Sequence, residues 1–257
     1  MQREGGLRAA WMTARRTGLR RVLHRMERIL RLRVIDPHLG PRLYPAPSDE
    51  SQRALGDNLS EILRDLAGLR VASSMAKKWD RERETLTLLN QAPFSLEPPV
   101  NWQAEPVDDP LWSFRLHSWE WAWPALVEGS AQEAVLALWR DWVTHVPVGQ
   151  GVAWQPDPVS RRLVVWSVAW HLLDGLLDED KELLGAIAQH AAYLVDHLER
   201  DLDNNHLIIN AKALAWAGLL FPDLRGARRW RMLGLSLLWN ALDEQVRSDG
   251  GHIENAT

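Results

Sequence analysis

Cysteine is absent from the 257 residues, and the chain has only three phenylalanines and two tyrosines. The lack of cysteine excludes disulfide bonds and thiolate-ligated metal sites. A transmembrane segment is not expected, because the most apolar run, residues 163–177, contains His171 and Asp174 and is shorter than the roughly 20 apolar residues that a spanning helix needs. No apolar stretch with a small-residue cleavage site follows the N-terminus. We therefore expect a cytoplasmic location, with the periplasm as the alternative.

Charge is almost balanced over the whole chain, with a net charge of −4, but it is unevenly spread. Residues 1–33 contain ten arginines and two glutamates. The overall balance gives no reason to expect nucleic-acid binding. Fifteen tryptophans are the most unusual feature of the composition. An indole ring suits the packing of large helices, and its flat face also suits stacking on sugar rings.

Apolar residues recur at helical spacing through most of the chain, and no convincing strand alternation is visible. A basic amphipathic helix is expected over residues 7–34, ended by Asp36-Pro37 and the prolines up to 47, and a second helix over 50–77. Prolines from 93 to 110 mark an irregular connector. Six further helices are expected at 111–127, 131–145, 159–177, 181–200, 208–221 and 226–246. Short turns between them favour an all-α stack of helical hairpins, either closed into a toroid or open as a solenoid.

The basic N-terminal helix has two interpretations. It could touch an anionic lipid surface or an acidic partner as a peripheral contact. It could instead pack on its own protein and leave a solvated arginine face. The spacing of its apolar residues is compatible with both.

The densest polar cluster in the apolar half is residues 201–206, followed by Asn210 and Lys212. Asn and Asp are good turn and N-cap residues, so a structural role is one interpretation. If a helix begins near His206, however, His206 and Asn210 share one of its faces. Amide donors and a titratable imidazole would then lie together at a helix N-terminus, which favours anions.

Other candidates are weaker individually. His252 and Glu254 follow an Asp-Gly-Gly turn signal near the C-terminus. His117 lies in a Trp-rich helix, where a packed core histidine is common. Arg161 and Arg162 could hold a carboxylate or sulfate through two hydrogen bonds. No tight metal-ligand spacing is present, so we predict neither a metal nor another cofactor.

Four segments resemble, in order, the N-terminal helical domain of the heparinase II/III and alginate lyase-like families. They are residues 112–117 (WSFRLH), 160–166 (SRRLVVW), 205–214 (NHLIINAKAL) and 249–254 (DGGHIE). The resemblance covers residues 94–257 well and 8–34 loosely. One departure is Val165, which stands where the family pattern has asparagine.

The resemblance implies an N-terminal helical extension over 1–92 and an incomplete (α/α) toroid over 93–257, without the β-sandwich domain that follows in the family. It implies a bacterial lyase that cleaves an acidic, uronate-containing polysaccharide by β-elimination. Asn205 and His206 match the positions that handle the carboxylate and assist proton transfer. The predicted substrate-binding residues are Asn210, His252, Glu254, His117, Arg162 and Trp119. Neither Tyr44 nor Tyr193 matches the position of the family's catalytic tyrosine, so we expect the chain to be a fragment that is inactive alone.

Two alternatives remain at this stage. The chain could be a non-catalytic glycan-binding or exopolysaccharide-assembly domain that keeps the groove but not the chemistry. It could also be a hydrolase, which needs two carboxylates at a suitable separation. Asp201, Asp203 and Glu254 are available for that chemistry, although their spacing does not favour a pair.

Overall fold

The computed structural model describes residues 19–48, 62, 63, 65, 79–105, 108–129, 131–173, 177, 180–201 and 205–245. Helices dominate this part of the chain. In order they are α2 (Leu19–Leu30), the π-helical turn η1 (Arg31–Ile35), α3 (Asp36–Leu43), α5 (Pro110–Ser118), the 3₁₀ turn η2 (Glu120–Ala122), α6 (Trp123–Glu128), α7 (Gln132–His145), the 3₁₀ turn η3 (Val152–Trp154), α8 (Pro156–Leu172), α9 (Lys181–Asp196), α10 (Asn205–Leu220) and α11 (Ala227–Gln245). Most of the helix predicted over 50–77 lies outside the described residues.

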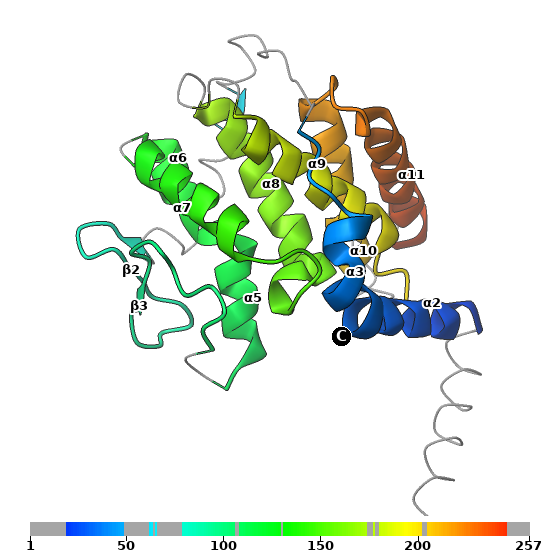
Figure 1. Cartoon of the computed structure of the whole chain (residues 1–257). Helices are drawn as coiled ribbons and strands as arrows, with labels where there is room; N and C mark the ends of the chain where they lie inside the picture. The colour runs from blue at the N-terminus through cyan, green and yellow to red at the C-terminus, as the bar shows by residue number, and fades with distance from the viewer. Residues whose placement is uncertain are drawn as a thin grey trace, which may run out of the picture.

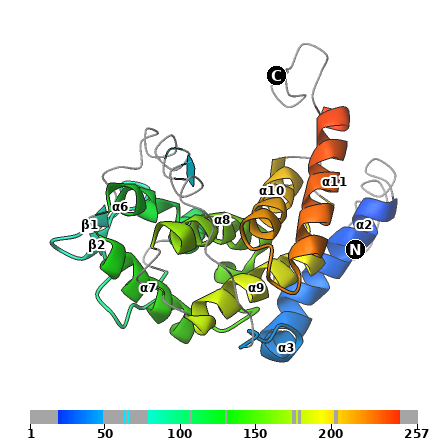
Figure 2. The ribbon, with the colours of Figure 1, turned by 90° about the horizontal axis from the view of Figure 1, so that it is seen from above.

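The helices follow one another around an arc. Figure 2 shows α6 and α7 at one end, α8 and α9 in the middle, and α10 and α11 at the other end. Helix α10 packs against both α8 and α11, and α8 also packs against α5 and α9. The predicted architecture of stacked helical hairpins is confirmed for this part of the chain. No helix among the described residues is long and apolar enough to cross a membrane.

A small antiparallel sheet was not predicted. Strands β1 (Trp79–Asp80), β2 (Thr85–Leu86) and β3 (Phe94–Ser95) pair in the order β1-β2-β3. Each strand has two residues, which is too short to produce a visible alternation of apolar and polar residues. The sheet lies at the end of the arc away from α11 (Figures 1 and 2).

Local sequence sets several helix ends. Asp109 caps α5, since its carboxylate accepts from the backbone N–H of Leu111, and Asp180 caps α9 in the same way at Leu183. The predicted helix 111–127 is instead divided at Trp119, whose φ of 63° is left-handed and ends α5. The burial of this indole, which is 0% exposed, stabilises a backbone conformation that tryptophan rarely adopts.

Tryptophans and one arginine form the centre of the core. The rings of Trp139, Trp142 and Trp119 all contact that of Trp166, with centroids 5.0, 5.1 and 5.6 Å apart. Arg162 is 0% exposed, and its guanidinium lies 4.1 Å from the centroid of the Trp142 ring. This part of the chain therefore uses its tryptophans mainly for packing.

The N-terminal segment is docked on α9 (Figure 1). The buried Asp36 carboxylate lies 2.7 Å from Nε2 of His197 and accepts from the Tyr193 hydroxyl at 3.3 Å. Gln189 donates to the backbone oxygen of Tyr44 at 2.6 Å. The sequence predicted a helix break at Asp36-Pro37, and this is wrong: α3 begins at Asp36 directly after η1. Pro37 occupies the first turn of α3, where no backbone N–H is needed. The predicted boundary after residue 92 stays a prediction.

Helix α2 and the turn η1 that follows it direct arginines toward the protein. Arg28 donates two hydrogen bonds to Asp201, at 2.9 and 2.6 Å, and Arg31 donates to the Tyr44 hydroxyl at 3.3 Å. Leu23, Met26 and Leu30 are 56%, 63% and 51% exposed. The interpretation in which the arginine face of this helix is solvated is therefore wrong for Arg28 and Arg31. A second exposed apolar row lies on α11, formed by Met232, Leu235, Trp239 and Leu242.

We expect Asp36→Ala to lower the free energy of unfolding by about 3–5 kcal/mol, because it leaves a buried histidine without its charged partner. Both side chains of the Asp36–His197 pair are 0% exposed. Urea denaturation measures the change. Glu27→Ala is the control: Glu27 is 58% exposed and pairs with Arg31 on the surface, so a change of at most about 0.5 kcal/mol is expected. Equal effects of the two substitutions would contradict a structural role for the buried pair.

Candidate active site

The first turn of α10 carries the two predicted catalytic residues. Asn205 is the first residue of the helix and is exposed, and the His206 side chain is 35% exposed. The first backbone N–H groups of a helix have no partner within it, and the helix dipole adds positive potential at this end. An amide and an imidazole therefore lie at a position that favours an anionic group.

His206 lines an open pocket of about 320 Å³ between the start of α10, α5 and the start of α8. One wall comes from α5 and combines apolar and polar side chains. The other wall comes from α8. The lining residues are Pro110, Leu111, Phe114, Arg115, Ser118, Asp157, Arg161 and His206.

Two guanidinium groups lie at this pocket, and carboxylates hold both in place. Arg161 donates through Nε to Asp157 at 3.0 Å and through Nη1 to Glu120 at 3.2 Å. Arg115 donates to the same Glu120 carboxylate at 3.3 Å. Burial lowers the pKa of Arg161, but the charges of Glu120 and Asp157 more than offset this and the pKa is raised. The Arg115 side chain is 35% exposed and the Arg161 side chain is 26% exposed, so both can also contact an anionic ligand.

Glu199 lies directly behind His206. Its Oε2 is 3.4 Å from His206 Nδ1, and its side chain is 6% exposed. The interaction with Glu199 raises the pKa of His206 and outweighs the opposing effect of partial burial, and the charge of Asp157 acts in the same direction as Glu199. The site therefore favours the imidazolium form, which carries a positive charge.

Asn210 is fully buried and lies behind the pocket rather than in it. Its amide nitrogen donates to Ser160 Oγ at 3.0 Å and to Glu199 Oε2 at 3.2 Å, and its oxygen accepts from the backbone N–H of Glu199 at 2.9 Å. The predicted substrate contact does not fit this position. Asn210 instead fixes Glu199.

Arg162 and Trp119, both predicted to bind substrate, are 0% exposed. Arg162 donates to the backbone oxygens of His117 and Ala153 and to His190. The Trp119 ring stacks on that of Trp102 with centroids 5.9 Å apart. Both belong to the core, which corrects the sequence prediction. Arg161, one residue earlier, is the arginine that reaches the pocket.

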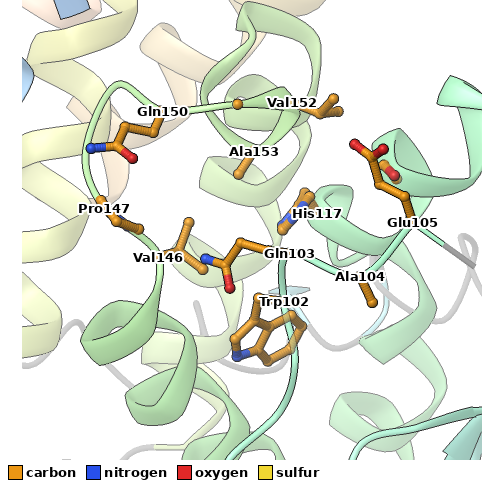
Figure 3. Close-up of a pocket in the computed structure, with 12 residues that line it drawn as sticks. Trp102, Gln103, Ala104, Glu105, His117, Val146, Pro147, Gln150, Val152 and Ala153 are labelled. Carbon is orange, nitrogen blue, oxygen red and sulfur yellow. The ribbon is translucent and has the colours of Figure 1, made fainter. Parts of the chain in front are cut away.

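His117 lies away from His206, on a different face of α5. It is 5% exposed and accepts a hydrogen bond at Nδ1 from Trp142 at 3.2 Å. It lines a second pocket of about 220 Å³ (Figure 3), where the loop of Pro147 and Gln150 faces the segment of Trp102 and Gln103. Burial, and then the charge of Arg162, lowers the pKa of His117 to about 3. The interpretation as a packed core histidine fits these contacts.

The remaining predicted positions do not add to the pocket. His252 and Glu254 lie outside the described residues. Both tyrosines of the chain are buried: Tyr44 donates to Asp196 and Tyr193 donates to Asp36, and burial raises the pKa of each phenol. Within the part of the chain that the structure describes, no three His, Asp or Glu side chains are grouped so that they could hold a metal ion.

The family described as Heparinase II/III N-terminus matches residues 71–257. The chain belongs to the heparinase II/III family. The heparin-sulfate lyase of Pedobacter heparinus is 28% identical over 171 residues, which cover 60% of this chain and 26% of that enzyme. The heparin-sulfate lyase of Bacteroides stercoris is 24% identical over 195 residues, or 64% of this chain and 29% of that enzyme. The chain thus spans between a quarter and a third of the length of these relatives.

Solved structures of heparinases share the fold. A heparan sulfate lyase from Pedobacter heparinus superposes with a TM-score of 0.57 at 22% identity, over 90% of this chain and 36% of that one. A heparinase III structure gives a TM-score of 0.55, also at 22% identity, over 83% of this chain and 35% of that one. The predicted all-α, incomplete toroid of a heparinase II/III N-terminal domain is confirmed.

Sequence reasoning missed Glu199 and Glu120 as members of the site. Asp157 and Arg161 carried a readable signal, because acid and base four residues apart share one face of a helix. The contact of Glu199 with His206 crosses from a loop to the next helix and has no such periodic signature.

The neutral His117 predicts a specific pH dependence of stability. Its pKa is about 3 in the folded protein but about 6.5 when unfolded, so protonation of the unfolded chain destabilises the fold as pH falls below 6.5. Between pH 7 and pH 5 this costs about 2 kcal/mol. Urea denaturation at both pH values measures the fall in the free energy of unfolding between pH 7 and pH 5. This fall should be smaller by about 2 kcal/mol in His117→Gln than in the wild type. The same loss in both proteins would contradict a neutral, buried His117.

Proposed function

We propose that this chain provides the carboxylate-binding part of an active site that cleaves an acidic, uronate-containing polysaccharide by β-elimination. Membership of a polysaccharide lyase family and the heparin-sulfate lyases among its relatives support this reaction class. The observation that carries the proposal is the start of α10, where Asn205 is exposed and the half-buried His206 lines a pocket that also contains Arg115 and Arg161.

The chemistry explains why such groups are needed. In the elimination a base removes the proton from C5 of the uronate, the bond from C4 to the leaving oxygen breaks, a C4–C5 double bond forms, and a proton passes to the leaving oxygen. Negative charge develops on the carboxylate when the C5 proton leaves. The Asn205 amide, the His206 imidazolium and the N-terminus of α10 can stabilise that charge, because they are positioned before the reaction begins.

Proton transfer needs another group. The family resemblance implies a tyrosine for this step, and both tyrosines of this chain are engaged in the core with pKa values raised by burial. A buried phenol of this kind is not a base for a substrate in the pocket. We therefore expect the 257-residue chain to bind acidic oligosaccharide without cleaving it, and a longer protein that contains it to supply the missing group.

In such a longer protein, Asn205→Ala or His206→Ala should lower the rate of elimination by roughly 10²–10³-fold, the usual cost of removing one donor that stabilises developing charge. The C4–C5 double bond absorbs in the far ultraviolet and reports the rate on a panel of uronate polymers. His145→Ala, a change at an exposed histidine on α7, is the control and should leave the rate unchanged. Wild-type rates in both site variants would contradict the site assignment.

Two alternatives have distinct outcomes. A glycan-binding or exopolysaccharide-assembly domain would bind the same oligosaccharides, and the longer protein would yield no unsaturated product. A hydrolase would yield products without a double bond. The hydrolase is disfavoured because the Asp201 side chain is 1% exposed and ion-paired with Arg28 at 2.6 Å, and because the nearer carboxylates, Asp157 and Glu120, are held by Arg161.

We also propose that α2 makes a peripheral contact with an anionic lipid surface, separate from the lyase site. Its apolar residues Leu23, Met26 and Leu30 are more than half exposed, and Arg25 and Arg33 on the same helical segment are exposed as well. Apolar side chains flanked by arginines are typical of helices that lie in a membrane interface. The arginine excess of residues 1–33 adds electrostatic attraction.

Co-sedimentation with vesicles tests this contact. The chain should bind phosphatidylglycerol vesicles in a salt-sensitive manner and bind phosphatidylcholine vesicles much less. The combined change Leu23→Gln, Met26→Gln and Leu30→Gln should weaken binding by at least about tenfold, because it removes three side chains from the apolar contact. Met232→Gln with Trp239→Gln, on the exposed face of α11, is the matched control. Equal binding by both variants would contradict the contact through α2.

A further inference from the structure

Between α9 and α10, the described residues 197–201 include a carboxylate that the lyase chemistry described above does not use. Glu199 is 5% exposed, and its backbone and side chain are both bonded to α10. A carboxyl group is rarely buried unless it has partners that favour its charged form. The partners in this case are His206 and Asn210.

We propose that Glu199 is the positioning residue of His206: its carboxylate holds the imidazole by Nδ1 and directs the other edge of the ring to the pocket. The proposal rests on the proposed function only for the identity of His206 as a catalytic group. The geometry that carries it is the 3.4 Å separation of Glu199 Oε2 and His206 Nδ1, together with the partial exposure of His206 at the pocket and the burial of Glu199.

Asn210 and Ser160 keep the carboxylate in place. The Asn210 amide spans Glu199, accepting from its backbone N–H and donating to its Oε2, and its nitrogen also reaches Ser160 Oγ on α8. Asn210 lies one helical turn after His206, so the same helix presents both the imidazole and the group that fixes its partner. Because Asn210 already holds the Glu199 carboxylate in one position, Glu199 loses little conformational freedom when it orients His206.

The loop that carries Glu199 is also anchored on both sides. His197, two residues before it, contacts Asp36 of α3 at 2.7 Å, and Asp201, two residues after it, accepts from Arg28 of α2 at 2.6 Å. The N-terminal segment thus limits the movement of the loop. This gives the inward-facing Arg28 a role that its sequence pattern did not predict.

Such a contact has two chemical consequences. It favours one tautomer, because a proton on Nδ1 of the neutral imidazole faces the Glu199 carboxylate 3.4 Å away and leaves the lone pair on Nε2. It also stabilises the imidazolium, and thereby the positive charge available to a uronate carboxylate. Other charges near His206 are Asp157, which acts in the same sense, and Arg161, which opposes it. Arg115 lines the same pocket from α5.

Nitrogen-15 NMR titration of the histidine side chains in the 257-residue chain tests the proposal without any need for lyase activity. In the wild type, neutral His206 should be the Nδ1–H tautomer, and its titration midpoint should lie above the ordinary value of about 6.5. Glu199→Gln, which keeps the shape but removes the charge, should shift the midpoint downward and increase the Nε2–H tautomer. Glu199→Asp keeps the charge and should restore part of the shift.

Asp157→Asn is the matched control, because it removes a carboxylate from the same pocket that acts on His206 only through its charge. It should lower the midpoint by less than Glu199→Gln and leave the tautomer unchanged. If Glu199→Gln does not fold, the wild-type spectrum still decides: an Nε2–H tautomer, or a midpoint at or below 6.5, would overturn the proposal. A Glu199→Gln midpoint equal to that of the wild type would overturn it as well. A shifted His206 titration in Glu199→Gln, together with an unchanged rate of elimination in a longer protein that carries the same substitution, would instead count against the proposed function.

Discussion

The fold depends on a buried guanidinium that has no carboxylate partner among the residues that the structure describes. Arg162 extends from α8 into the tryptophan core, where it donates to backbone oxygens of α5 and η3 and to His190 of α9. Taking a cation out of water is costly unless its donors are satisfied. Hydrogen bonds from all three guanidinium nitrogens and the face of the Trp142 ring satisfy the charge. One side chain thereby fixes the relative positions of α5, η3, α8 and α9.

That constraint extends to the candidate active site. The pocket lies between α5, α8 and the start of α10, so its width depends on how α5 and α8 are held together in the core. Arg161, the neighbour of Arg162, lies on the pocket side of α8 and contacts Glu120 and Asp157. Two adjacent arginines on one helix therefore have different tasks: one connects the helices, and the other adds charge to the surface that they form.

The N-terminal segment contributes to the site through α9 and the following loop. Asp36 and Arg28 hold His197 and Asp201, and Glu199 lies between these two positions. The segment before residue 92, which was predicted as an extension of the toroid, thus contacts the loop on which the orientation of His206 depends. Burial of the Asp36–His197 pair favours a fixed arrangement, since buried polar groups tolerate little displacement from their partners.

The sequence by itself determined the helical architecture and most helix boundaries after residue 110, because periodicity, capping residues and turn residues are local signals. The helix predicted over 208–221 begins at Asn205 in the structure, which places Asn205 and His206 in its first turn. The ordered motifs also identified the family. Only the tertiary structure decided that Arg161 rather than Arg162 reaches the pocket, that Asn210 is buried, that α2 docks by its arginines, and that Glu199 contacts His206. The physical reason is that neighbours on a helix point about 100° apart, and the side that becomes buried depends on partners distant in sequence. For Arg28 that partner is Asp201, and for Asn210 it is Ser160.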